Sequence, residues 1–287
     1  MTIEFALVAG AGLMGHGIAQ SLAATGRSVV LYEPDLGRAT AGRDRIATNL
    51  ERSVAKGRLT AEDRDALVAR IEATDDLGRA AGVELVVEAV FEDIAVKTTL
   101  WAELDRRAPA GAIFASNTSS ISIDTLAAAV AAPRRTHFAG MHFFSPVAVM
   151  PLIELIRGSA TSDETETAIR ALAADMGKQV IVSADRPGFI VNRILLPFLG
   201  ESMRALEEGL GSADDIDTGA KVGLNHPMGP LELADFIGLD VCLGIMRVLH
   251  DGFDQAHFAP PRVLVELVEA GHLGQKTGRG FHTYPRG

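Results

Sequence analysis

The sequence feature that most constrains the fold of this chain is an apolar run that is followed by closely spaced glycines. Residues 6–15 read ALVAGAGLMG, in which three glycines have the spacing G-x-G-x-x-G. The run before them, Ile3 to Ala9, predicts a buried strand, and apolar residues at helical spacing after them predict a helix. A strand-to-helix turn of this kind offers a close backbone approach and helix N-terminal N–H groups to a pyrophosphate. We therefore expect a dinucleotide to contact Gly10, Gly12, Leu13, Met14 and Gly15.

A second β-branched run gives this motif its acidic partner. Ser28 to Tyr32 predicts a strand, and Glu33 follows it directly, about 20 residues after the glycines. A carboxylate at that place binds the ribose 2′-hydroxyl of NAD and repels the 2′-phosphate of NADP. The sequence therefore predicts NAD as the cofactor. A glycine-rich turn in some other α/β protein is the alternative.

Composition excludes several other classes of protein. The 287 residues are 47% hydrophobic and 22% charged, which is ordinary for a folded globular protein of two domains or one large one. A formal charge of −10 argues against nucleic acid or an anionic membrane as the main partner. The single Cys242 excludes an internal disulfide and a cysteine-only metal site, and we expect no metal ion. No signal peptide and no membrane span are predicted, so a cytoplasmic location is expected.

Strands and helices alternate through the first two thirds of the chain. Helices are predicted over residues 36–55, 60–68, 94–107, 123–130 and 163–175, and strands over 84–88, 112–116, 138–146, 152–156 and 179–183. This alternation indicates an α/β fold with a parallel, doubly wound sheet of the Rossmann type. The pattern breaks at Arg186, so residues 1–185 are expected to form the NAD-binding domain.

Residues 186–287 are expected to form an all-helical domain. Phe189 to Leu199 is apolar almost all round, which predicts an enclosed helix that contacts a symmetry mate. Further helices are predicted over residues 212–221, 229–237, 239–250 and 261–270. Asn192 stands inside the apolar helix, where an amide needs a hydrogen-bond partner. An internal bond to the backbone and a functional contact are both open explanations.

Polar side chains gather where two further strands end. Ser116 to Ile123 crowds hydroxyls and an amide at the carboxyl end of a strand, which suits either a ligand site or a helix N-cap. His142 and Glu154 each stand among apolar residues in neighbouring strands. Either residue alone is more often a hydrogen-bonded core residue. A buried glutamate beside a histidine, however, holds the ring in one tautomer and raises its basicity, as a general base requires.

Six motifs resemble those of one family. They are GAGLMGHGIAQ (10–20), SNTSS (116–120), GMHFFSPVAVMPLIE (140–154), PGFIVNR (187–193), HPMGPLEL (226–233) and KTGRGFHTY (276–284). Together they resemble the 3-hydroxyacyl-CoA dehydrogenases over essentially the whole chain, and most of all the short, single-function 3-hydroxybutyryl-CoA enzymes. The resemblance implies an oxidoreductase of fatty-acid metabolism and β-oxidation that acts on short 3-hydroxyacyl-CoA thioesters. It also implies a homodimer formed through the C-terminal domain.

The resemblance also implies roles for individual residues. His142 corresponds to the base that takes the hydroxyl proton, and Glu154 to its partner. Ser119 and Asn192 match residues that hold the reacting oxygen and the thioester region of the substrate, and Ser119 also lies near the cofactor. Further cofactor contacts are implied for Glu92, Lys97, Ser145 and Lys276, and a contact with the CoA moiety is implied for Lys56.

One position departs from the usual family pattern. Many members have asparagine where this chain has Ser145, beside the nicotinamide, so retained activity with altered cofactor affinity is expected. Two other functions are open alternatives. One is a related dehydrogenase that acts on a sugar acid or carnitine, and the other is a crystallin-like protein that binds NAD without catalysis.

Overall fold

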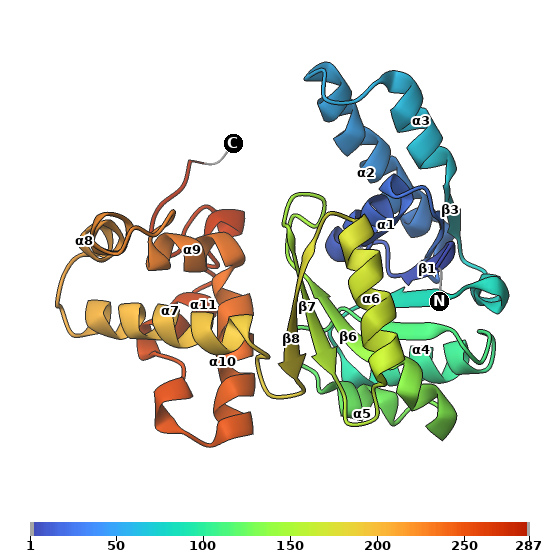
Figure 1. Cartoon of the computed structure of the whole chain (residues 1–287). Coiled ribbons are helices and arrows are strands. Elements are labelled where there is room, and N and C mark those ends of the chain that lie inside the picture. The colour runs from blue at the N-terminus through green and yellow to red at the C-terminus, as the bar shows by residue number, and fades with distance from the viewer. Residues whose placement is uncertain (1–2, 286–287) are drawn as a thin grey trace. The chain divides into compact units, whose positions relative to one another are not determined.

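The computed structural model describes residues 3–285 of the chain (Figure 1). These residues divide into two compact units, of which the first ends at Arg186 and the second begins at Pro187. Each unit has its own hydrophobic core and is described separately.

The first unit is built on an eight-stranded sheet. The strand order is β3-β2-β1-β4-β5-β6-β7-β8, with β1 at the point where the chain order reverses. That order is typical of a Rossmann-type fold, in which ligands bind at the carboxyl ends of the strands. The strands are β1 Phe5–Ala9, β2 Ser28–Tyr32, β3 Ile71–Thr74, β4 Leu85–Glu88, β5 Ile113–Ser116, β6 Phe138–Phe143, β7 Leu152–Arg157 and β8 Gln179–Ala184.

The sheet differs from the prediction in two places. All neighbouring strands are parallel except β6 and β7, which pair antiparallel. Only eight residues, 144–151, join these two strands, and a parallel crossover needs a dozen or more. Strand β3 was not predicted from the sequence, because its four residues, Ile71–Thr74, are too few to give a distinct pattern and lie at the edge of the sheet.

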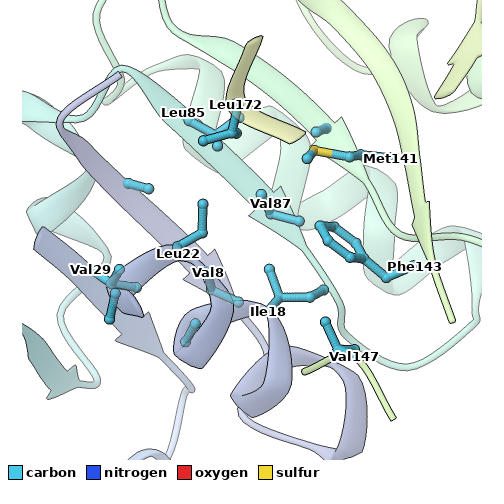
Figure 2. Packing of buried hydrophobic residues seen from close by; sticks show 14 of the residues in the cluster. Val8, Ile18, Leu22, Val29, Leu85, Val87, Met141, Phe143, Val147 and Leu172 are labelled. Atoms are coloured by element: carbon cyan, nitrogen blue, oxygen red, sulfur yellow. The ribbon is translucent and has the colours of Figure 1, made fainter. Parts of the chain in front are cut away.

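One face of the sheet packs against helices α1 and α6, with the hairpin of α2 and α3 beside them (Figure 1). Figure 2 shows Ile18 and Leu22 of α1 among the strand residues Val8 and Val87. The apolar residues that recur at helical spacing after the glycines are all fully buried, namely Ile18, Ala19, Leu22 and Ala23. The helices of this unit are α1 Leu13–Ala24, α2 Leu36–Ala55, α3 Ala61–Ala69, α4 Ile94–Asp105, α5 Ile123–Ala127 and α6 Asp163–Asp175.

Aromatic residues form much of the core on the opposite face. Trp101 of α4 stacks on Phe114 of β5 at a centroid distance of 5.0 Å and meets Phe138 of β6 edge-on at 4.8 Å. Because side chains alternate along a strand, His142 in β6 points to the same face as Phe138. Its neighbours Met141 and Phe143 point to the α1 face (Figure 2).

The second unit is helical. Within its described residues, β pairing is confined to isolated bridges, of Gly274 with Arg279 and of Arg279 with Thr283. Helix α7 forms its core together with α9, α10 and α11. The helices are α7 Val191–Glu207, α8 Ala213–Thr218, α9 Pro230–Ile237, α10 Leu239–Phe253 and α11 Arg262–Glu269.

The prediction for α7 was wrong in one respect. The helix is longer than its apolar run and continues to Glu207, so only one side is enclosed. Leu196, Leu199 and Met203 are buried on that side, whereas Ile194 is 69% exposed. The short window from 189 to 199 concealed this amphipathic pattern. Among residues 3–285, no helix is both long enough and apolar enough to span a bilayer.

Helix α1 offers a direct test of the first core. Ile18 is fully buried and Leu13 is 68% exposed on the same helix. We expect Ile18→Ala to lower the free energy of unfolding by about 2–5 kcal/mol. Leu13→Ala should change it by less than about 0.5 kcal/mol. Urea unfolding of both variants without cofactor measures the difference, and equal midpoints would contradict the packing described for α1.

Candidate active site

The glycine turn connects β1 to α1. Gly10 has φ of +103°, a conformation that favours glycine, and a Cβ on Gly15 would lie 1.7 Å from the Gly10 carbonyl oxygen. A Cβ on Gly12, by contrast, would meet nothing within 4 Å. Gly12 is the N-cap of α1 without a side-chain cap, and the first helical hydrogen bond comes from the His16 N–H. The turn therefore presents open space and helix N-terminal N–H groups, which fit a dinucleotide pyrophosphate.

Glu33 lies beside this turn. The residue as a whole is 8% exposed, and its Oε1 accepts a hydrogen bond from the Ala11 N–H at 2.8 Å. The backbone supports the same arrangement, because the Gly10 N–H donates to the Tyr32 carbonyl at 2.8 Å. The sequence placed Glu33 at the ribose of the dinucleotide, and the structure brings it to the glycine turn that would hold the pyrophosphate.

His142 and Glu154 occupy opposite positions in the antiparallel pair of β6 and β7. His142 Nδ1 lies 3.1 Å from Glu154 Oε2, and the two residues are 5% and 0% exposed. In the neutral ring, Nδ1–H donates to this carboxylate, which leaves Nε2 as the acceptor. The histidine is thus held in the tautomer that a general base needs.

Ser119 lies beside the other ring nitrogen of this imidazole. Its Oγ is 3.1 Å from His142 Nε2. Ser119 belongs to the polar stretch after β5, for which the sequence left a ligand site and an N-cap open. The structure assigns the cap of α5 to Ser122, whose Oγ accepts from the Thr125 N–H. Ser119 is therefore not the cap and faces the histidine instead.

Glu92 holds the loop that carries Ser119. Its Oε1 accepts hydrogen bonds from the Thr118 hydroxyl, the backbone N–H groups of Ser119 and Ser120, and the Ser120 hydroxyl. Its Oε2 pairs with Lys97 Nζ at 2.9 Å. Burial raises the pKa of Glu92, but Lys97 and the hydrogen bonds from Thr118 and Ser120 outweigh it and lower the pKa below its ordinary value. Glu92 is therefore a carboxylate at neutral pH.

Lys97 is 1% exposed and links Glu92 to a second carboxylate. Its Nζ lies 2.7 Å from Oε1 of Glu88, which is fully buried at the end of β4. Glu88 also accepts from the Ser116 hydroxyl at 2.7 Å. A buried charge needs such partners. From the sequence, Glu88 was predicted only as the end of a strand. Its polar contacts were not predicted, because a single polar residue there produces no periodic signal.

The turn between β6 and β7 carries Ser145, which is exposed. Lys178 holds this turn, since its Nζ donates to the carbonyls of Val147 at 2.6 Å and Met150 at 2.8 Å. Burial lowers the pKa of Lys178. Val147 in turn packs on Gly17 of α1, where a Cβ would come within 2.9 Å. Sequence reasoning missed Lys178, which lies in the short connection from α6 to β8.

Three other predicted residues lie away from this cluster along the chain. Lys56 is exposed at the C-cap of α2. Asn192 is buried in the first turn of α7, and Lys276 forms an ion pair with Asp240 in the second unit. The roles expected of Asn192 and Lys276 rest on the family resemblance.

The first unit thus combines a glycine turn that fits a dinucleotide with a paired histidine and glutamate and a serine hydroxyl. All of them lie toward the carboxyl ends of parallel strands, where ligands bind in an open α/β sheet. A neutral histidine held by a carboxylate can take the proton from an alcohol while a dinucleotide takes the hydride. The arrangement fits the oxidation of a secondary alcohol or the reverse reduction.

Two sequence models of one family match the chain in succession. Residues 6–186 match "3-hydroxyacyl-CoA dehydrogenase, NAD binding domain", and residues 188–284 match "3-hydroxyacyl-CoA dehydrogenase, C-terminal domain". The first unit is therefore an NAD-binding domain.

Individual proteins agree with this assignment. A probable 3-hydroxybutyryl-CoA dehydrogenase of Bacillus subtilis is 45% identical over 99% of this chain and 98% of its own length. The 3-hydroxybutyryl-CoA dehydrogenase of Bradyrhizobium diazoefficiens is 49% identical over 96% and 94%. The crystal structure of (S)-3-hydroxybutyryl-CoA dehydrogenase from Ralstonia eutropha superposes with a TM-score of 0.96 at 42% identity, covering 99% of this chain and all of the other. The chain belongs to the 3-hydroxyacyl-CoA dehydrogenase family.

Proposed function

We propose that this protein oxidises (S)-3-hydroxyacyl-CoA to 3-oxoacyl-CoA with NAD and catalyses the reverse reduction. The observation that carries the proposal is the chain of contacts from Glu154 through His142 to Ser119, within an NAD-binding domain. In the oxidation, the hydroxyl proton of the substrate passes to His142 Nε2. At the same time, the carbon that carries this hydroxyl loses its hydrogen as a hydride. Bound NAD supplies the hydride acceptor.

Each residue of the cluster has a distinct part in this reaction. Glu154 orients the His142 ring and stabilises the imidazolium that forms when the proton arrives. Ser119 donates a hydrogen bond to the reacting oxygen, and a contact with the substrate is proposed for Asn192 on the family resemblance. Glu92 fixes the Ser119 loop through four hydrogen bonds, which keeps the hydroxyl within reach of the histidine.

The substrate is proposed to be a short acyl-CoA such as 3-hydroxybutyryl-CoA. The Bacillus and Bradyrhizobium relatives, which are named as 3-hydroxybutyryl-CoA dehydrogenases, support this choice. The helical hairpin of α2 and α3 supports a CoA contact, because residues 36–70 carry eight Lys or Arg against five Asp or Glu in a chain of net charge −10. Lys56 is exposed between the two helices and suits a CoA phosphate.

Several properties stay predictions. Lys97, Ser145 and Lys276 are proposed to contact NAD together with the glycine turn, Glu33 and Glu92. Residues 186–287 are proposed to bind substrate and to form a homodimer, for which the exposed apolar Ile194, Val222 and Phe236 supply suitable surface. A cytoplasmic location and a role in β-oxidation are proposed on the sequence argument and on the family.

The oxidation of NADH with acetoacetyl-CoA as the other substrate tests the proposal. We expect turnover, and a series of acyl-CoA lengths should show the highest kcat/KM with short chains. Turnover with a sugar acid or carnitine and none with acyl-CoA would contradict the substrate. NADH binding without any turnover would favour a non-catalytic protein.

Substitution of His142 distinguishes a catalytic role of this residue from a purely structural one. His142→Gln keeps much of the shape but removes the proton acceptor, so kcat should fall by about 10²–10⁴-fold. The affinity for NADH should stay near the wild-type value, because the glycine turn lies on other elements. Measuring kcat, the Kd for NADH and Tm on one preparation distinguishes the two roles. Wild-type kcat in a folded variant would end this mechanism.

Glu154→Gln should also slow turnover, since the amide can orient the ring but cannot stabilise the imidazolium. The double variant with His142→Gln should cost much less than the product of the two single effects, because residues that act as a unit are not additive. Independent, multiplicative losses in kcat would contradict a shared role for the pair.

Gly12 tests the cofactor turn. Gly12→Val should fold normally, because an added Cβ meets nothing within 4 Å, but should weaken NADH binding by about tenfold or more through loss of hydrogen bonds to the pyrophosphate. Gly244→Val in α10 is the matched control, since its Cβ also meets nothing within 4 Å. Fluorescence titration with NADH measures both variants, and equal Kd values would exclude Gly12 from the pyrophosphate site.

Sedimentation of the wild-type chain at micromolar concentration tests the homodimer. We expect a dimer, because a second copy would cover apolar residues of the helical unit. A monomer under these conditions would contradict the proposed assembly and would leave the catalytic proposal unaffected.

A further inference from the structure

Glu33 is held in place by the backbone beside the cofactor turn. Its Oε1 accepts the hydrogen bond from Ala11, and its side chain is only 10% exposed. The carboxylate cannot turn away from the glycine turn without breaking this bond. The carboxylate is therefore held at the site at which the adenosine ribose of a dinucleotide is recognised.

Arg38 lies next to this carboxylate in the first turn of α2. Its Nη2 is 3.8 Å from Glu33 Oε1, and its side chain is 73% exposed. That distance allows an ion pair but no direct hydrogen bond. Because the Glu33 end of the pair is mostly buried, solvent screens the attraction less than between two fully exposed charges. The carboxylate therefore draws the guanidinium toward itself through charge, without fixing its geometry.

The two residues match opposite cofactors. A carboxylate accepts hydrogen bonds from the ribose hydroxyls of NAD, whereas a guanidinium binds the 2′-phosphate of NADP through its planar fork of donors. In this chain the acid is buried and hydrogen-bonded to the backbone, and the arginine beside it is exposed. A nearby second acid, Asp35, caps α2 by accepting from the Arg38 N–H and adds negative charge to the same corner.

We propose that Arg38 is a 2′-phosphate ligand that Glu33 keeps inactive, so that the two residues together determine the choice between NAD and NADP. Glu33 repels the phosphate directly and also neutralises the only strong phosphate donor that contacts it among the described ion pairs. Removal of the Glu33 charge then does more than relieve repulsion, because it releases Arg38 to bind the phosphate. The proposal depends on the proposed function only for the identity of the cofactor.

Binding titrations of the whole chain test this without turnover. The Kd values for NADH and NADPH are measured by fluorescence for the wild type, Glu33→Ser, Glu33→Gln, Arg38→Met and the double variant of Glu33→Ser with Arg38→Met. Glu33→Gln keeps an oxygen that can accept from Ala11, so it guards against loss of the fold in Glu33→Ser. A further double variant, Glu33→Ser with Arg45→Met, removes a positive charge two turns along the same helix.

We expect Glu33→Ser to lower the Kd for NADPH by about tenfold or more, the effect of one hydrogen-bonded ion contact. The double variant with Arg38→Met should lose most of this gain, and the one with Arg45→Met should keep it. Arg38→Met alone should leave the Kd for NADH within about twofold, since no strong contact is lost.

Two results would overturn the proposal. One is a gain in NADPH affinity that survives Arg38→Met, which would mean that Glu33 acts by repulsion alone. The other is no gain in either Glu33 variant while NADH still binds. Failure of the wild type to bind NADH would instead contradict the proposed cofactor, so the two failures are distinguishable.

Discussion

The parallel pairing of β1, β2, β4, β5 and β6 is the constraint on which the site depends. Parallel strands bring their carboxyl ends to one edge of the sheet, and the loops that follow these strands carry the functional side chains. The glycine turn follows β1, Glu33 follows β2, Glu92 follows β4, and Ser119 follows β5. Residues spread over more than a hundred positions of the chain therefore come to the same edge of the sheet.

Buried charges keep this edge in order. Lys97 joins Glu88 to Glu92, and these carboxylates in turn bind the hydroxyls of Ser116 and Thr118. Removal of one member would leave an uncompensated charge in the interior, which costs far more than the pair contributes when it is complete. The loop with Ser119 is thus fixed through Glu92 and its ion pair with Lys97. His142, which this loop faces, is instead held in the strand pair of β6 and β7.

Sequence reasoning reached those parts of the fold that local patterns determine. The helices over residues 36–55 and 163–175 have the predicted bounds, because Asp35 and Ser162 are N-caps and the apolar spacing is regular. The contact of His142 with Glu154 was also predicted, from two polar residues within apolar strands. Lys178, Glu88 and the strand β3 were missed, since each depends on tertiary partners that leave no periodic trace in the sequence. The exposed side of α7 was missed for another reason. The window of residues 189–199 was too short to show that the whole helix is amphipathic.

The hairpin of β6 and β7 has a consequence for folding. His142 and Glu154 are only twelve residues apart, so their strands can pair with a small loss of loop entropy. The contacts of Glu92 with the Ser119 loop close segments of 26 to 28 residues. The parallel pairings join residues that are 23 to 79 positions apart. Local pairings form sooner than distant ones in most small domains. The base and its partner are thus expected to meet early, as a preformed unit onto which the cofactor half of the sheet is later assembled.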